Sequence, residues 1–133
     1  MTKKRKRLYL VIGGLALLGV VMTVSLGASV FSIFSLIAAC LVKSRERFMG
    51  IGQVLTMPLF FASNAIYPID MMPQWLRHVA AANPLSYEVD ALRTLMIGGA
   101  ASAFGLGTDF AVQGFALAVL TAVATKLYPT LVN

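Results

Sequence analysis

Cysteine, histidine and acidic residues are scarce in this sequence. Cys40 is the only cysteine and His78 the only histidine, and five acidic residues stand against eleven basic ones. One cysteine excludes an internal disulfide, and one Cys with one His excludes a Cys/His metal cluster. No GxxxxGK[ST] motif is present, and His78 has no Ser or Cys nucleophile at a recognisable spacing. We therefore expect no enzyme active site, no metal and no directly bound cofactor.

Apolar side chains are abundant instead. Hydrophobic residues make up 59% of the 133 positions, charged residues 12%, and the mean hydropathy is +0.83. Soluble domains lie nearer 45–50% apolar and about 25% charged. The composition predicts an integral membrane protein, with a basic head over 1–7 and a single membrane domain over 8–133.

The basic residues gather beside the apolar runs. One cluster is "KKRKR" at 3–7, and a second, in "KSRER" at 43–47, contains Lys43, Arg45 and Arg47. Such clusters are typical of cytoplasmic flanks of membrane spans, where they also contact anionic lipid headgroups. No interleaving of aromatic and basic residues supports nucleic-acid binding, so we expect the lipid bilayer as the partner of these charges.

Three apolar runs are candidate membrane spans, at about 8–42, 48–66 and 109–126. A bilayer core needs about 20 helical residues, so the first run is either one overlong helix or two short spans joined near "SLGAS" at 25–29. A signal peptide fits less well, because its apolar region is usually about 7–15 residues long. The fold class is all-α, with three spans in the first case and four in the second.

The two cases place the basic head on opposite sides of the membrane. With two spans in 8–42, the head and the 43–47 loop both face the cytoplasm, as their charge favours. With one span the head faces outward. No proline or Asn-Gly turn interrupts the run, which favours a continuous helix, and the sequence leaves both alternatives open.

Small residues recur at steps of three or four along the first run. On a helix they share one face, which lets another helix approach closely and lets hydroxyl groups bond across the contact. We predict a packing role for this stripe of Ser25, Ser29, Ser32, Ser35 and Ala39. The alternative is that the serine hydroxyls bond back to carbonyls of their own helix.

Prolines punctuate the polar segment between the second and third runs. Pro73 precedes a predicted helix at 74–82, and Asn83 suits the cap of a second helix at 84–97 with Pro84 at its first position. Asp90 and Arg93, three residues apart, can pair on that helix.

Neither helix is long enough to cross a bilayer alone. We therefore predict an external re-entrant helical hairpin, in which Tyr67 and Trp75 lie at the membrane–water interface. Within the second apolar run, Gln53, Thr56, Ser63 and Asn64 are candidates for buried polar residues.

The stretches "FFASNAIYPIDMMPQWL" and "NPLSYEVDALR" resemble the C-terminal half of type-2 permeases of ATP-binding-cassette (ABC) exporters. The resemblance runs from about residue 20 to the end. It implies a multi-pass protein of the cell membrane that forms part of a translocation path, while a partner ATPase subunit uses ATP. It further implies an external gate, built from Tyr67, Pro68, Pro73, Trp75, Asn83, Pro84, Asp90 and Arg93.

The chain departs from that family in length, since it carries only about half of a permease. We expect the family's first spans, and the cytoplasmic coupling helix that contacts the ATPase, to lie outside this sequence. The resemblance thus implies an ABC ATPase subunit as one partner, and a second permease subunit or the missing N-terminal half as another. The alternative is a truncated, non-transporting membrane protein, or an assembly partner of a full-length permease.

Overall fold

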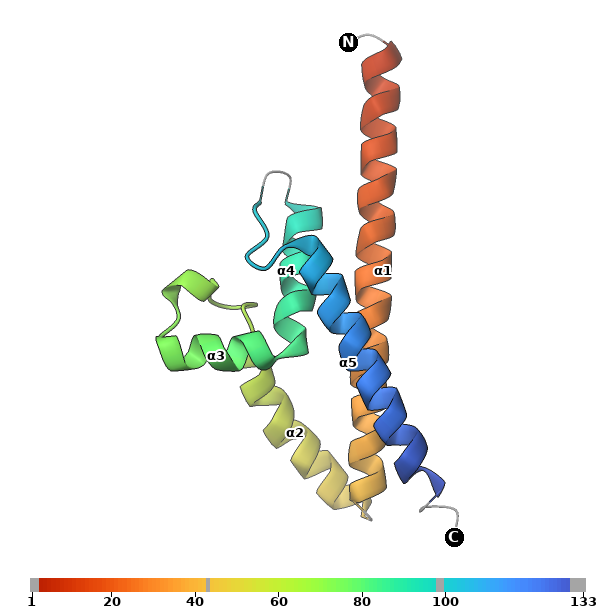
Figure 1. Cartoon of the computed structure of the whole chain (residues 1–133), viewed down its shortest axis with the longest axis vertical. Coiled ribbons are helices and arrows are strands. Elements are labelled where there is room, and N and C mark those ends of the chain that lie inside the picture. Colours follow the sequence, from red (N-terminus) through yellow and green to blue (C-terminus); the bar gives the residue numbers. More distant parts are fainter. Residues whose placement is uncertain (1–2, 43, 98–99, 130–133) are drawn as a thin grey trace.

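The computed structural model describes residues 3–42, 44–97 and 100–129, and it is all-helical (Figure 1). Five α-helices follow one another: α1 (Lys3–Leu41), α2 (Arg45–Ala62), α3 (Gln74–Ala82), α4 (Pro84–Met96) and α5 (Leu106–Leu127). A 3-10 turn, η1 (Ile69–Met71), lies between α2 and α3. Lys43 of the second basic cluster lies outside the described residues, as do Gly98 and Gly99.

The first apolar run forms one continuous helix. α1 has 39 residues, which at 1.5 Å per residue is about 58 Å long, nearly twice the ~30 Å of a bilayer core. Its N-terminal part extends beyond the other helices (Figure 1), where Leu10 is 76% exposed and a Cβ on Gly13 or Gly14 would meet nothing within 4 Å. The continuous-helix alternative is therefore the observed one, and the helix separates the two basic clusters by its full length.

The core is a three-helix contact in which α1, α4 and α5 pack pairwise, whereas α2 and α3 make fewer contacts with the rest. Figure 1 shows α4 and α5 beside the middle of α1, α2 leaning away from it, and α3 lying crosswise. Arg45 and Arg47, at the start of α2, and Lys126, near the end of α5, lie at the same end of the bundle. The connector between α4 and α5 lies at the other end.

The face of α1 that meets α4 and α5 is built from small residues. Gly19, Thr23 and Gly27 recur every four positions, and Thr23 and Gly27 are buried. The Thr23 hydroxyl donates to the Gly19 carbonyl at 2.8 Å, so it needs no partner outside its own helix. Small side chains let helix backbones approach closely in a membrane, which is how α4 reaches α1 here.

The predicted small-residue stripe lies on a different face. Ser25, Ser29, Ser32, Ser35 and Ala39 are all exposed within the described chain. The hydroxyls of Ser25 and Ser29 donate to the carbonyls of Val21 and Ser25 at 2.7 Å. For these two serines the back-bonding alternative holds, and the packing role of the stripe remains a prediction about a partner outside this chain.

Two helices in the described chain are long and apolar enough to cross a membrane, α1 and α5. α2 was expected to span as well, but it ends at Ala62 and its first turn contains Arg45, Glu46 and Arg47. Only 15 of its residues, 48–62, follow those charges, and they give a rise of about 22 Å. Gln53 and Thr56, expected to be buried, are exposed on α2, whereas Ser63 and Asn64 are buried as expected.

Candidate functional site

The α3–α4 hairpin, Gln74–Met96, turns at Asn83. The Asn83 side chain accepts a hydrogen bond from the Leu85 backbone N–H at 3.1 Å, and Pro84 occupies the first helical position. Both residues act as their types predict: a side-chain acceptor satisfies a free N–H, and proline needs no donor there. α3 spans its predicted residues, and α4 ends one residue before its predicted end at 97.

Two long-range hydrogen bonds tie this hairpin to the end of α2. The Asn83 amide Nδ2 donates to the Leu59 carbonyl, and Arg93 Nη2 donates to the Asn64 carbonyl, both at 2.7 Å. Asn83 is 3% exposed and Asn64 is 1% exposed. Because buried carbonyls need donors, each bond fixes the hairpin against α2 at a defined position.

Asp90 does not use Arg93 as its partner, contrary to the expected ion pair. Its carboxylate Oδ2 accepts from the Ser102 hydroxyl at 2.7 Å and from the Phe104 backbone N–H at 3.1 Å. Arg93 points instead to Asn64. Asp90 therefore joins α4 to the connector that leads into α5, while Arg93 joins α4 to α2.

Tyr87 strengthens the same junction. Its hydroxyl donates to the Ala81 carbonyl at 2.7 Å, and its ring lies 4.5 Å from the Phe104 ring, centroid to centroid. Aromatic pairs at this separation add stability beyond the area that they bury. The residue thus contacts both α3 and the connector to α5.

The segment before the hairpin carries the interfacial residues. Pro68 precedes η1 and Pro73 precedes α3, each with extended backbone that starts a helical turn. Tyr67 is 55% exposed and Trp75 is 67% exposed, as suits aromatic rings at a membrane–water boundary. Arg77 closes this segment by donating to the backbone carbonyls of residues 70 and 72 at 2.7 and 3.0 Å.

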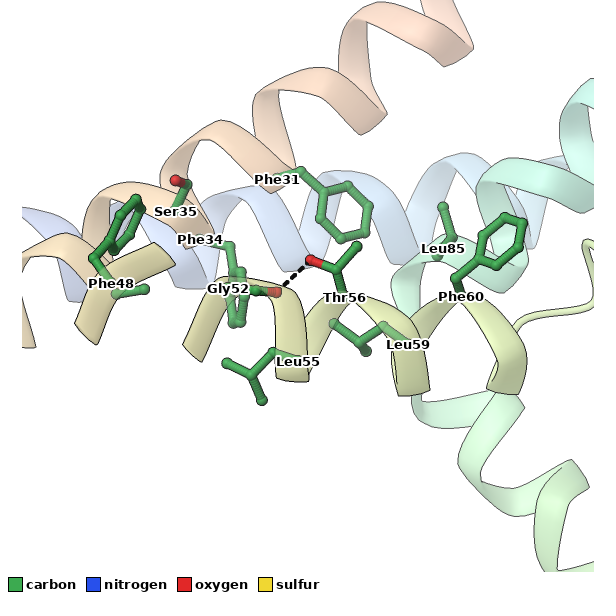
Figure 2. A pocket seen from close by; sticks show the side chains of 11 residues that line it. Phe31, Phe34, Ser35, Phe48, Gly52, Leu55, Thr56, Leu59, Phe60 and Leu85 are labelled. Atoms are coloured by element: carbon green, nitrogen blue, oxygen red, sulfur yellow. Dashed lines mark hydrogen bonds between the residues drawn. The ribbon is translucent and has the colours of Figure 1, made fainter. Parts of the chain in front are cut away.

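An apolar cavity of about 410 Å³ opens between α1 and α2 (Figure 2). Four phenylalanines contribute to its wall, two from α1 and two from α2: Phe31, Phe34, Phe48 and Phe60. Ser35 of α1 and Leu85 of α4 also line it, and the Thr56 hydroxyl bonds back to Gly52 at 2.7 Å, which leaves little free polarity. Such a wall suits an apolar chain or ring.

Sequence reasoning missed three residues of the α4–α5 junction: Ser102, Asp109 and Gln113. Ser102 is half-buried, and Asp109 and Gln113 are at most 1% exposed. An Asp and a Gln four residues apart in an apolar run were the available signal, since polar residues inside membrane helices are costly and usually functional. Among the described residues, no group of three His, Cys, Asp or Glu side chains could hold a metal ion.

Residues 8–97 match the family model described as "ABC-2 type transporter". Over 102 residues the chain is 31% identical to the daunorubicin resistance ABC transporter permease protein DrrB1 of Streptomyces coeruleorubidus, covering 77% of this chain and 35% of that protein. It is 37% identical over 62 residues to the putative transport permease ycf38 of Cyanophora paradoxa, covering 47% and 21%. Nodulation protein J of Rhizobium meliloti is 28% identical over 75 residues, covering 56% and 29%.

The matched part is thus about a third or less of each relative's length. No solved structure matches the chain.

Proposed function

Because the chain belongs to the ABC-2 type transporter family, we propose that it forms the C-terminal part of an exporter permease. A permease of this family is a non-catalytic membrane subunit. In the proposal α1 and α5 cross the membrane, α2 leads from the cytoplasmic end of α1 toward the external side, and the α3–α4 hairpin forms the external gate. A separate ATPase subunit drives export by hydrolysing ATP.

The observation that carries the gate is how the hairpin is held. Its helices have nine and thirteen residues, about 14 and 20 Å long, so neither crosses a ~30 Å core. Yet α4 packs on α1 and α5, and hydrogen bonds from Asn83 and Arg93 tie it to α2. A short hairpin anchored to α1, α2 and α5 can close one end of a path and move as a unit.

The charges at one end of the bundle support the orientation, whereas the basic head at 3–7 of the continuous α1 then lies on the external side, against the usual preference of Lys and Arg. Arg45 and Arg47 lie at the end that also carries Lys126, which fits a cytoplasmic side. The hairpin and the connector between α4 and α5 lie toward the opposite end (Figure 1). The proposal therefore assigns the gate to the external side.

The proposal requires further polypeptide. The exposed stripe of Ser25, Ser29, Ser32, Ser35 and Ala39 is polar for a lipid-facing surface, and it suits contact with a second permease subunit or with the spans that the longer relatives carry. The cavity between α1 and α2 would lie beside that contact and give the path an apolar wall.

Cysteine labelling tests the placement of the gate. In a Cys40→Ser background, Met71→Cys on η1, a residue that is 75% exposed, should react with a membrane-impermeant maleimide added to intact cells. Glu46→Cys at the start of α2 should react only after the membrane is permeabilised. The reverse pattern would place the hairpin in the cytoplasm and overturn the gate.

Affinity purification from native membranes tests the partners. We expect an ABC ATPase subunit to co-purify, together with a polypeptide that carries further membrane spans. Recovery of a full-length permease without any ATPase would support the assembly-partner function instead, and recovery of neither would support a non-transporting membrane protein.

A further inference from the structure

Three polar side chains meet where α4, the connector and α5 come together. Asp90 Oδ2 lies 2.7 Å from the Ser102 hydroxyl, and Asp109 Oδ2 lies 3.3 Å from the same hydroxyl. The backbone N–H of Gly105 donates to Ser102 Oγ at 2.6 Å. Asp90 is 2% exposed and Asp109 is fully buried, so two buried carboxyl groups share one half-buried serine.

One lone pair of the Ser102 hydroxyl oxygen lacks a hydrogen-bond donor. A serine hydroxyl has one proton and two acceptor lone pairs. The shorter contact assigns that proton to Asp90, and the Gly105 N–H takes one lone pair. A contact to an ionised Asp109 would then join two acceptors, whereas a protonated Asp109 would donate to the remaining lone pair and complete the chain.

Gln113 gives an independent indication that the site lacks something. It lies one turn after Asp109 on α5, is 1% exposed, and neither atom of its amide has a partner. Residues four apart on a helix share a face, so Gln113 lies on the same face of α5 as Asp109. Asp109 Oδ1 is also without a donor. Burying unpaired polar atoms is costly, and an ionised carboxylate is the most costly of them.

Among the described residues, no charged group near the site could neutralise the Asp109 carboxylate in place of a proton. α1 has no titratable side chain between Tyr9 and Cys40, and neither do the described residues of the connector, 97 and 100–105. On α4 the titratable neighbours are Tyr87, Glu88 and Arg93. Tyr87 donates to Ala81, Glu88 faces Gly27 of α1, and Arg93 donates to Asn64. On α5 the other charge is Lys126, at the far end of the helix.

We propose that Asp109, Ser102 and Asp90 form a proton-binding site, in which a proton held by Asp109 is relayed through the Ser102 hydroxyl to the Asp90 carboxylate. Binding converts the Asp109 carboxylate to a carboxylic acid, and no other bond forms or breaks. The proton holds the connector against both α4 and α5. Its loss leaves two buried carboxylates competing for one hydroxyl, which favours release of the connector. The site stands on this geometry and does not depend on transport.

Infrared spectroscopy of the whole chain, purified in detergent, tests the site. At about pH 5.5, where an ordinary aspartic acid is still largely ionised, we expect a C=O stretching band of a protonated carboxyl group. Asp109→Asn should abolish that band. Asp70→Asn, which removes an exposed carboxyl group, should leave it unchanged. Absence of the band in the native protein, or its survival in Asp109→Asn, would overturn the proposal.

Three further measurements keep the result interpretable. Ser102→Ala retains both carboxyl groups but removes the relay, so the band should shift in frequency, and an unshifted band would contradict the role of Ser102. Glu88→Gln separates any contribution from that partly buried residue, and loss of the band in this variant would assign the proton to Glu88 instead. Loss of the native band on adding calcium chloride would show that the site binds a cation, and it would overturn the proposal of a proton-binding site.

Discussion

Glu88 of α4 lies directly against Gly27 of α1, so closely that a Cβ on Gly27 would coincide with the Glu88 carboxyl group. The contact joins the middle of the long helix to the hairpin that we propose as the gate. It exists because α1 presents no side chain at this position. The close approach of α1 and α4 therefore depends on one missing methyl group.

Gly27→Ala should weaken this contact because the carboxyl group must move away. We expect the free energy of unfolding in detergent to fall by about 1–3 kcal/mol, the usual cost of overpacking. In a Glu88→Ala background the same change should cost nothing, since the two residues are coupled. Thermal denaturation of the four proteins gives the coupling energy.

Gly14→Ala is the matched control for that experiment. It lies on the same helix, and a Cβ there would have no neighbour within 4 Å. An equal loss of stability at Gly14, or an equal loss with and without Glu88, would show that the effect comes from the helix itself and not from the contact.

Asn83→Ala should loosen the hairpin at its turn. The variant loses the cap of α4 and the bond to the Leu59 carbonyl together. A lost cap costs about 1 kcal/mol and a buried carbonyl without its donor about 1–3 kcal/mol, so a clear drop in melting temperature is expected. Ser44→Ala is the control, because Ser44 precedes α2 without a side-chain cap bond. Similar drops for both variants would contradict this account.

Arg93→Ala should destabilise the chain more than Arg77→Ala. Arg93 supplies a donor to the carbonyl of the buried Asn64, and its loss costs about 1–3 kcal/mol. Arg77 also donates to backbone carbonyls, but it is exposed and water can replace it. The comparison is made by thermal unfolding in detergent, and the prediction fails if the order of the two variants is reversed.

Pro84→Ala should impair export while leaving membrane insertion intact. Proline at the first helical position restricts the backbone where the hairpin turns, without removing a hydrogen bond. Alanine there lets the turn sample other conformations, so the gate closes less well. Energy-dependent efflux, measured in cells that contain the partner ATPase, should fall although the protein level in the membrane is unchanged. Unchanged efflux would remove Pro84 from the gate.

The local signals in the sequence predicted the hairpin closely. Pro73, Asn83 and Pro84 bound α3 and α4 to within one residue, because proline and capping residues act on the backbone beside them. The boundaries of the apolar helices were less close. α5 begins three residues before its predicted start, and α2 ends four residues before its predicted end. A run of apolar residues does not by itself show where a helix begins or ends.

Contacts between distant segments could not be predicted in the same way. The packing prediction fell on the serine-rich face of α1, whereas Gly19 and Gly27, on another face, lie against Leu95 and Glu88 of α4. Asp90 and Arg93 looked like a pair on one helix but bond to different segments. Each outcome depends on which helices lie beside that face, and spacing along one helix contains no information about this.

By itself the sequence determined that the chain is helical and apolar, where the hairpin turns, and which residues cap it, since these follow from composition and from interactions between near neighbours. Only the tertiary structure decided which face of α1 is buried, that Asn83 and Arg93 hold α2, and that Asp90 and Asp109 share one serine. Those relationships join residues far apart in the chain, and they arise only when helix packing brings their backbones within reach of a single hydrogen bond.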